Sequence, residues 1–159
     1  MKTKTFPGDD TSTISEGKAW IREEALKRGG ICPCCMRLTR FQRYGLGHRM
    51  ARELLVLYRR FRSNNDWLHA PNYLRSLKAD DRDTGALVKL GLLEAKGRSS
   101  GIHRMTQLGL DFAGGKVSIP KWHYEYNGNE IPSPGGKIPN ITIFDAIPKT
   151  EYAELVNPE

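Results

Sequence analysis

Long hydrophobic runs are missing from this sequence. The longest uninterrupted apolar stretch is LLVLY, at residues 54–58. That stretch is far shorter than the roughly 20 apolar residues a helix needs to cross a bilayer. The first 17 residues, MKTKTFPGDDTSTISEG, also lack the apolar segment of a secretory signal peptide. We therefore expect no membrane partner and a cytoplasmic location.

Cysteine is scarce, because the chain has three cysteines and all of them fall in the CPCC turn at residues 32–35. Three clustered cysteines cannot all pair within the chain, and the adjacent Cys34 and Cys35 have poor geometry for a disulfide. The pattern argues against a disulfide-stabilised secreted scaffold. It favours a reducing compartment, which agrees with a cytoplasmic location.

The sequence also lacks the motifs of common enzyme classes. No glycine-rich phosphate loop follows an expected strand, since SPGGK at residues 133–137 does not have the P-loop spacing. No Ser-His-Asp or paired-carboxylate arrangement can be argued from the spacing of the residues. We expect a protein that is not an enzyme.

Acidic residues are outnumbered: 25 Lys and Arg stand against 18 Asp and Glu, for a formal net charge of +7. The excess lies in residues 1–46 and 47–113, with net charges of +4 and +5, whereas residues 114–159 carry −2. A basic surface favours an acidic partner, and nucleic acid is the most common one. The other interpretation is a charge that serves solubility alone.

Residues 1–46 form the first expected segment. TISE, at residues 13–16, fits a capping box in which Thr13 caps a helix and Glu16 returns the hydrogen bond. That helix is expected to reach about Arg28 and to stop at Gly29. The cysteine turn follows, and then the alternation of RLTRFQRY predicts a strand or hairpin arm.

Residues 47–113 form the second expected segment, which contains the strongest helix of the chain. Its apolar residues recur at intervals of three and four, as on one face of a helix. The expected elements are a helix at 48–61, a short apolar link at 67–70, a helix at 71–77, a helix after ADDRD that ends at Gly91, strands at 92–96 and 102–109 around a turn at 97–101, and a brief closing helical turn.

This order is that of a winged helix-turn-helix. KLGLLE (89–94) resembles the junction between the second motif helix and the wing in winged-helix regulators of the MarR and PadR type, and MTQLGLDFA (105–113) resembles their exit from the wing. The whole layout is also similar to a group of small bacteriophage proteins, in which a CP-x-C turn precedes a winged helix and a short β-rich tail. The resemblance implies an α+β fold with a winged helix-turn-helix core, an N-terminal helix and cysteine turn, and a C-terminal β-rich extension.

A winged helix reads the major groove with its second motif helix and touches phosphate with its wing. We therefore expect a phage-encoded regulator that binds double-stranded DNA. The acidic entry of the second motif helix, at residues 79–83, would repel phosphate. A second interpretation stays open for this reason: a protein–protein interaction module that acts as inhibitor or adaptor of a host or phage complex. The expected nucleic-acid contacts are Lys89, Lys96, Arg98, Ser99, Ser100, Arg104, Arg40 and Arg43.

The CPCC turn has three interpretations. A C-x-x-C turn with proline is half of a zinc ribbon, and Cys32 and Cys35 are the expected ligands of a structural zinc. The second cysteine pair is absent, so His48 is the expected third ligand, and a site shared by a homodimer would also complete the count. The alternatives are a reduced turn that packs as small hydrophobic residues, and a redox dithiol, which no thioredoxin-like βαβ pattern supports.

Residues 114–159 form the third expected segment. Trp122, Tyr124 and Tyr126 alternate with polar residues, which predicts a strand with one aromatic face, and NGN at 127–129 supplies a hairpin turn. The aromatic face either packs on the winged helix or anchors a dimer or a protein partner. A strand at 141–144 and a terminal helical turn at 149–156 complete the segment.

Overall fold

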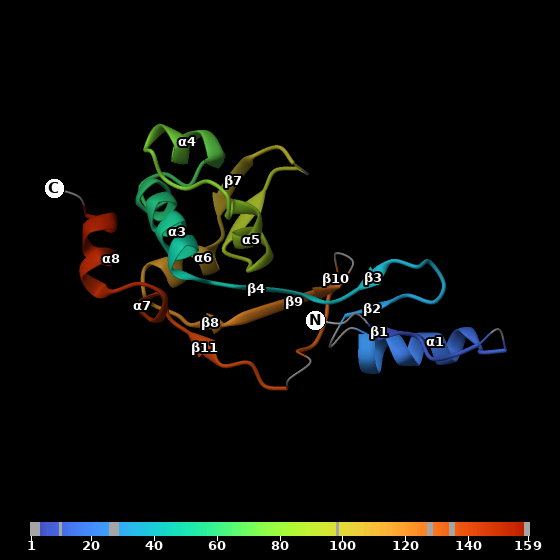
Figure 1. The fold of residues 1–159 in the computed structure, drawn as a ribbon. Helices are drawn as coiled ribbons and strands as arrows, with labels where there is room; N and C mark the ends of the chain where they lie inside the picture. Colours follow the sequence, from blue (N-terminus) through green and yellow to red (C-terminus); the bar gives the residue numbers. More distant parts are fainter. Residues whose placement is uncertain are drawn as a thin grey trace. The chain divides into compact units, whose positions relative to one another are not determined.

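The computed structural model describes residues 4–9, 11–25, 29–97, 99–126, 129–133 and 136–157. The fold is α+β, with helices and small, mostly antiparallel sheets (Figure 1). The chain divides into two compact units: unit 1 is residues 1–43 with 124–136, and unit 2 is residues 44–123 with 137–159. The expected third segment thus contributes to both units. No helix in the described ranges is long and apolar enough to cross a membrane.

Unit 1 begins with the helix α1 (Ile14–Trp20). The expected capping box is confirmed: the Glu16 carboxylate accepts from the Thr13 N–H at 2.6 Å, and the Thr13 hydroxyl accepts from the Glu16 N–H at 3.3 Å. The α-helix is shorter than expected, because a π-helical turn, η1 (Ile21–Ala25), follows it. Residues 26–28 lie outside the described part of the chain.

Short strands complete unit 1. Strand β1 (Lys4–Thr5) lies parallel to β2 (Gly30–Ile31), and β2 pairs antiparallel with β3 (Leu38–Thr39), so that β2 and β3 enclose the cysteine turn. The arm expected at 37–44 is divided between β3 and β4 (Gln42–Gly45). Strand β10 (Asn129–Glu130) pairs antiparallel with β9 (Trp122–Tyr126), as the expected hairpin requires. With β4 they form a sheet in the order β10-β9-β4, and the chain passes from one unit to the other within β4 and within β9.

The elements that lie wholly in unit 2 are α3 (His48–Phe61), β5 (Leu68–His69), α4 (Ala70–Ser76), α5 (Thr84–Lys89), β6 (Leu93–Ala95), β7 (Ile102–Met105), α6 (Gln107–Ala113), β8 (Ile119–Pro120), β11 (Asn140–Ile141), α7 (Ile143–Ala146) and α8 (Lys149–Val156). Strands β5, β7 and β6 form an antiparallel sheet in that order, with Leu68 opposite His103 and Glu94 opposite Arg104. Strands β8 and β11 form a separate pair.

Two expected strands of unit 2 end early because a helix cap intervenes. The strand expected at 102–109 stops at Met105, since the Thr106 hydroxyl accepts from the Gly109 N–H at 2.9 Å and starts α6. The strand expected at 141–144 stops at Ile141, since Thr142 and Asp145 form a capping box that starts α7. The helix expected at 48–61 is confirmed with the same bounds.

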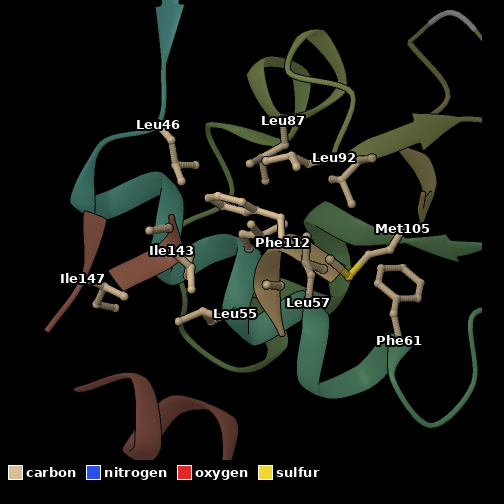
Figure 2. Packing of buried hydrophobic residues seen from close by; sticks show 14 of the residues in the cluster. Leu46, Leu55, Leu57, Phe61, Leu87, Leu92, Met105, Phe112, Ile143 and Ile147 are labelled. Carbon is tan, nitrogen blue, oxygen red and sulfur yellow. The ribbon is translucent and has the colours of Figure 1, made fainter. Parts of the chain in front are cut away.

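The core of unit 2 is built on α3. Figure 2 shows the Phe112 ring in the middle of the cluster, with Leu55 and Leu57 of α3 and with Leu87 and Leu92 around it. Other helices of the unit contact α3, including α4, α5, α6 and α8. The cluster also takes in three side chains of the C-terminal segment, Ile143, Ile147 and Val156. Burial of each large apolar side chain stabilises the fold by about 1.5–3 kcal/mol, so the C-terminal helices are part of this core.

The contact between Gly109 and Leu92 offers a test of this packing. A Cβ atom on Gly109 would lie 2.0 Å from the backbone oxygen of Leu92, so one of the two backbones must shift. We expect Gly109→Ala to lower the free energy of unfolding, measured by urea denaturation, by about 1–3 kcal/mol. Gly85→Ala is the matched control, because Gly85 is also helical but has open space around its Cβ direction. The control should gain about 0.5–1 kcal/mol. Equal effects of the two substitutions would contradict the packing of α6.

Candidate functional site

The predicted wing is the connection between β6 and β7, residues 96–101, and backbone contacts hold its base. The Lys96 N–H donates to the Ile102 carbonyl at 2.9 Å and extends the strand ladder by one step. The Ser100 hydroxyl donates to the Gly97 carbonyl at 3.2 Å and accepts from the Ile102 N–H at 3.1 Å. The Ser100 hydroxyl therefore makes its hydrogen bonds within the turn. Lys96 and Ser99 are exposed, and the predicted contact Arg98 lies outside the described residues.

Gly101 connects the predicted wing to the start of α4 through a backbone hydrogen bond. Its carbonyl accepts from the Ala70 N–H at 3.0 Å and lies 2.9 Å from Nδ1 of His103. It has a φ of +69°, and a Cβ atom here would lie 2.7 Å from Nε2 of His69, so both the backbone and the space favour glycine. Burial lowers the pKa of His103, which favours a neutral ring at the base of the wing.

Arg104 lies on β7, beside the predicted wing, and contacts residues of two neighbouring segments. Its Nε lies 2.6 Å from the Glu94 carboxylate on the neighbouring strand, and its guanidinium stacks 4.6 Å from the centre of the Trp67 ring. A partly exposed ion pair and a cation–π contact each contribute about 1 kcal/mol or less. Together they connect β7 to β6 and to the residue that precedes β5. In the structure its charge is balanced by Glu94, and a contact between Arg104 and phosphate stays a prediction.

The helix α5 presents few side chains to solvent. Thr84 and Leu87 are buried, and Gly85 and Lys89 are the exposed positions of the helix. Lys89 is its last residue, next to the turn that leads into β6. A charged contact from α5 to an acidic partner therefore depends on Lys89.

The acidic entry of α5 is neutralised by arginines from three places in unit 2. Each of its aspartates forms an ion pair, and two of the three pairs have two hydrogen bonds to one carboxylate. These bonds hold the pKa of Asp80 well below its usual range, mainly through Arg82. The closest distances are 2.7 Å for Arg49–Asp83, 2.7 Å for Arg82–Asp80 and 2.6 Å for Arg75–Asp81.

Asp83 precedes α5, yet its side chain makes no cap hydrogen bond. The carboxylate binds Arg49 instead, at 2.7 Å and 2.9 Å. Asp83 therefore does not cap α5, because both of its carboxylate oxygens are bonded to Arg49.

Glu53 of α3 supports the same helix start from inside the unit. Its side chain is only 1% exposed, and its Oε2 accepts from the Asp83 N–H at 3.0 Å, while its Oε1 has no hydrogen-bond partner among the described residues. Burial raises its pKa to about 7, and the nearby charges of Asp83, Asp80 and Asp81 act in the same direction. Glu53 therefore couples the position of α5 to the protonation of a buried carboxyl group.

Sequence analysis missed Glu53, although a signal was present. Glu53 stands three residues after Met50 and four before Leu57, on the apolar stripe of the predicted helix. A charged residue on such a stripe is either buried with a partner or marks the edge of the stripe. The ion pairs of Arg49, Arg75 and Arg82 had no comparable signal.

The cysteine turn of unit 1 is a tight reversal between β2 and β3. The Cys32 N–H donates to the Arg37 carbonyl and the Met36 N–H donates to the Cys32 carbonyl, both at 2.9 Å. The backbone N–H groups of Cys35 and Cys34 form hydrogen bonds to the Cys32 sulfur and lower the pKa of this thiol. Cys32 is buried, Cys34 and Cys35 are exposed, and all three are free thiols.

The third predicted zinc ligand, His48, has another neighbour. It belongs to unit 2, where its Nε2 lies 2.8 Å from the Glu151 carboxylate. Nowhere in the described ranges do three or more His, Cys, Asp or Glu side chains gather as a metal site. A zinc held by Cys32, Cys35 and His48 of one chain stays a prediction.

The aromatic residues predicted as partner anchors are half-buried. The Trp122 ring packs over the backbone of Gly45, so closely that a Cβ atom there would lie 2.3 Å from the ring. Tyr124 meets Phe41 edge to face, with ring centres 5.4 Å apart. Tyr126 lies opposite Asn129 in the β9–β10 pair. Trp122 and Tyr124 therefore bury part of their apolar surface against residues of their own units.

The raised pKa of Glu53 makes the stability of the chain depend on pH. The proton on the Glu53 carboxyl group binds more tightly to the folded chain than to the unfolded one. Its contribution to the free energy of unfolding is therefore fully present below about pH 4.5 and is lost as the pH rises to about 7. We expect Glu53→Gln, which keeps an acceptor for the Asp83 N–H, to remove a decline of at most about 3 kcal/mol over this window. The measurement is the free energy of unfolding as a function of pH. Glu154→Gln, at an exposed glutamate, is the control, and parallel pH profiles for wild type and Glu53→Gln would contradict the buried carboxyl.

Comparison with known proteins adds no further constraint on this site. No protein-family model, curated protein or solved structure matches the chain.

Proposed function

We propose that the chain is a small, non-enzymatic winged-helix protein that binds double-stranded nucleic acid as a regulator, through α5 and the wing of unit 2. The observation that carries this proposal is the order of elements α3, β5, α4, α5, β6, wing, β7, together with the strand order β5-β7-β6. In a winged helix-turn-helix, the second motif helix enters the major groove and the wing contacts the adjacent backbone. Helix α5 and residues 96–101 occupy those two places in the chain.

The ion pairs at the entry of α5 support this proposal over the alternative. The acidic entry was the feature that argued against nucleic acid. Because each aspartate has an arginine partner, the six side chains together add no net negative charge to this surface. The repulsion expected between isolated carboxylates and phosphate is therefore reduced.

The proposed contacts divide into two roles. Lys89, Lys96 and Ser99 are exposed on α5 and the wing and would meet phosphate, with Arg98 as an additional contact from the sequence. Arg104 and Ser100 would instead position the wing, since each is engaged within the sheet or the turn. Arg40 and Arg43 belong to unit 1 and stay a separate prediction of basic contacts.

The alternative function, a protein–protein interaction module, depends on the aromatic residues of β9 as anchors. Trp122 and Tyr124 already pack within their units, and hot-spot aromatics bind best when their surface is free to enter a partner's pocket. This geometry favours nucleic-acid binding as the better-supported function.

A salt series on a short labelled DNA duplex tests the proposal. Fluorescence anisotropy between about 50 and 200 mM salt gives the slope of log affinity against log salt, which reports the number of phosphate contacts. We expect Lys89→Ala and Lys96→Ala each to weaken binding and to reduce the slope by about 1. Lys18→Ala, on the exposed surface of α1, removes the same charge from unit 1 and should leave the slope unchanged.

Two results would count against this proposal. The first is no binding at low salt, and the second is an equal effect of the Lys18 control. A complex with a protein partner that has fixed stoichiometry and survives nuclease treatment would support the interaction module instead.

A further inference from the structure

The cysteine turn is a reversal closed by backbone hydrogen bonds. The Cys32 N–H donates to the Arg37 carbonyl and the Met36 N–H donates to the Cys32 carbonyl, both at 2.9 Å. The chain reverses directly after Cys35, where Met36 has a φ of +55°. These bonds hold the two ends of the C-x-x-C segment together, and a C-x-x-C turn supplies two of the four ligands in many structural zinc centres.

Among its described residues, unit 1 by itself supplies an incomplete set of ligands to this turn. The three cysteines belong to unit 1, whereas all four histidines, His48, His69, His103 and His123, belong to unit 2. These rings already have neighbours in unit 2: His48 has Glu151, His69 accepts from the Asn72 N–H, His103 meets the Gly101 carbonyl, and the His123 ring lies 6.3 Å from that of Tyr44. In the part of the chain that the structure describes, no group of three metal-binding side chains forms. A structural zinc takes four ligands, and a C-x-x-C turn offers two.

The surface beside the turn is apolar and exposed. Met36, the residue after Cys35, is 72% exposed, and Ile14 of α1 is 69% exposed. Both line a cavity of about 340 Å³ together with Pro33 and Cys34. Large apolar side chains that stand in water next to each other indicate a surface that another molecule covers.

We propose that two copies of this chain share one zinc ion, held by Cys32 and Cys35 of each copy. A two-fold axis through the metal converts each two-thiolate half-site into a closed site of four thiolates, the composition of many structural zinc centres. Met36 directly follows the ligand Cys35 and shares a cavity with Ile14, so the contact between the two copies would give these exposed side chains an apolar neighbour. Zn²⁺ displaces the thiol protons to solvent as it binds. Cys34, which is exposed and lines the cavity, is not a ligand.

Native mass spectrometry and metal analysis of the full chain, purified under reducing conditions and supplied with Zn²⁺, test the proposal. The expected species is a dimer with one zinc per two chains, which a chelator converts to monomer and Zn²⁺ restores. Cys32→Ser and Cys35→Ser should each lose both the zinc and the dimer. Cys34→Ser, in the same turn, and His48→Ala, at the predicted in-chain ligand, are the controls and should keep both.

A second measurement does not depend on variants that could fail to fold. Co²⁺ bound to the wild-type chain gives a thiolate-to-cobalt absorption whose intensity increases with the number of thiolate ligands, and four are expected. Two or three thiolates, one zinc per monomeric chain, loss of zinc in His48→Ala, a dimer that is insensitive to chelator, or no zinc bound at all would each overturn the proposal. None of these readouts involves DNA, so failure here is distinguishable from failure of the proposed nucleic-acid binding.

Discussion

Burial of one face of α3 is the interaction on which the larger unit depends. Leu54, Leu55 and Leu57 are fully buried and Phe61 nearly so, and the helices α4, α5, α6, α7 and α8, which all follow α3 in the sequence, contact this helix. At about 1.5–3 kcal/mol for each large apolar side chain, the stripe is comparable with the whole net stability of a small domain. The Glu53 carboxylate of α3 also accepts a hydrogen bond from the Asp83 N–H at the start of α5. The core therefore helps to set the position of the proposed nucleic-acid surface.

Ion pairs between side chains, and not only the excess of basic residues, determine the surface charge of unit 2. The net charge of +7 suggests an open basic surface, but several arginines of unit 2 are bound to carboxylates on neighbouring elements. Each such pair contributes little stability where it is exposed. Its larger effect is on the surface potential. The charge of Arg49 balances that of Asp83 at the entry of α5, and the charge of Glu94 balances that of Arg104 on β7. The basic residues that can act on a partner are therefore fewer than the composition indicates.

Local signals in the sequence predicted much of the fold. The apolar spacing of residues 48–61 predicted α3 with the same bounds, and Thr13 and Glu16 predicted the cap of α1. Prediction failed where a short apolar run and a cap compete: in ITIF, at 141–144, the β-branched residues suggested a strand, but Thr142 and Asp145 start a helix. Of the candidate site, the exposed Lys96 and Ser99 could be named from the sequence, whereas the structural use of Arg104 and Ser100 could not.

The sequence by itself determined the elements whose signals lie within a few residues: the periodic helix, the caps and the compact CPCC turn. The tertiary structure alone decided which charges meet, because Arg49 and Asp83 are 34 residues apart in the chain and His48 and Glu151 are 103 apart. It also assigned all the cysteines to one unit and all the histidines to the other. Such pairings depend on how the chain returns on itself, and the residue types at either end, taken alone, do not specify a partner.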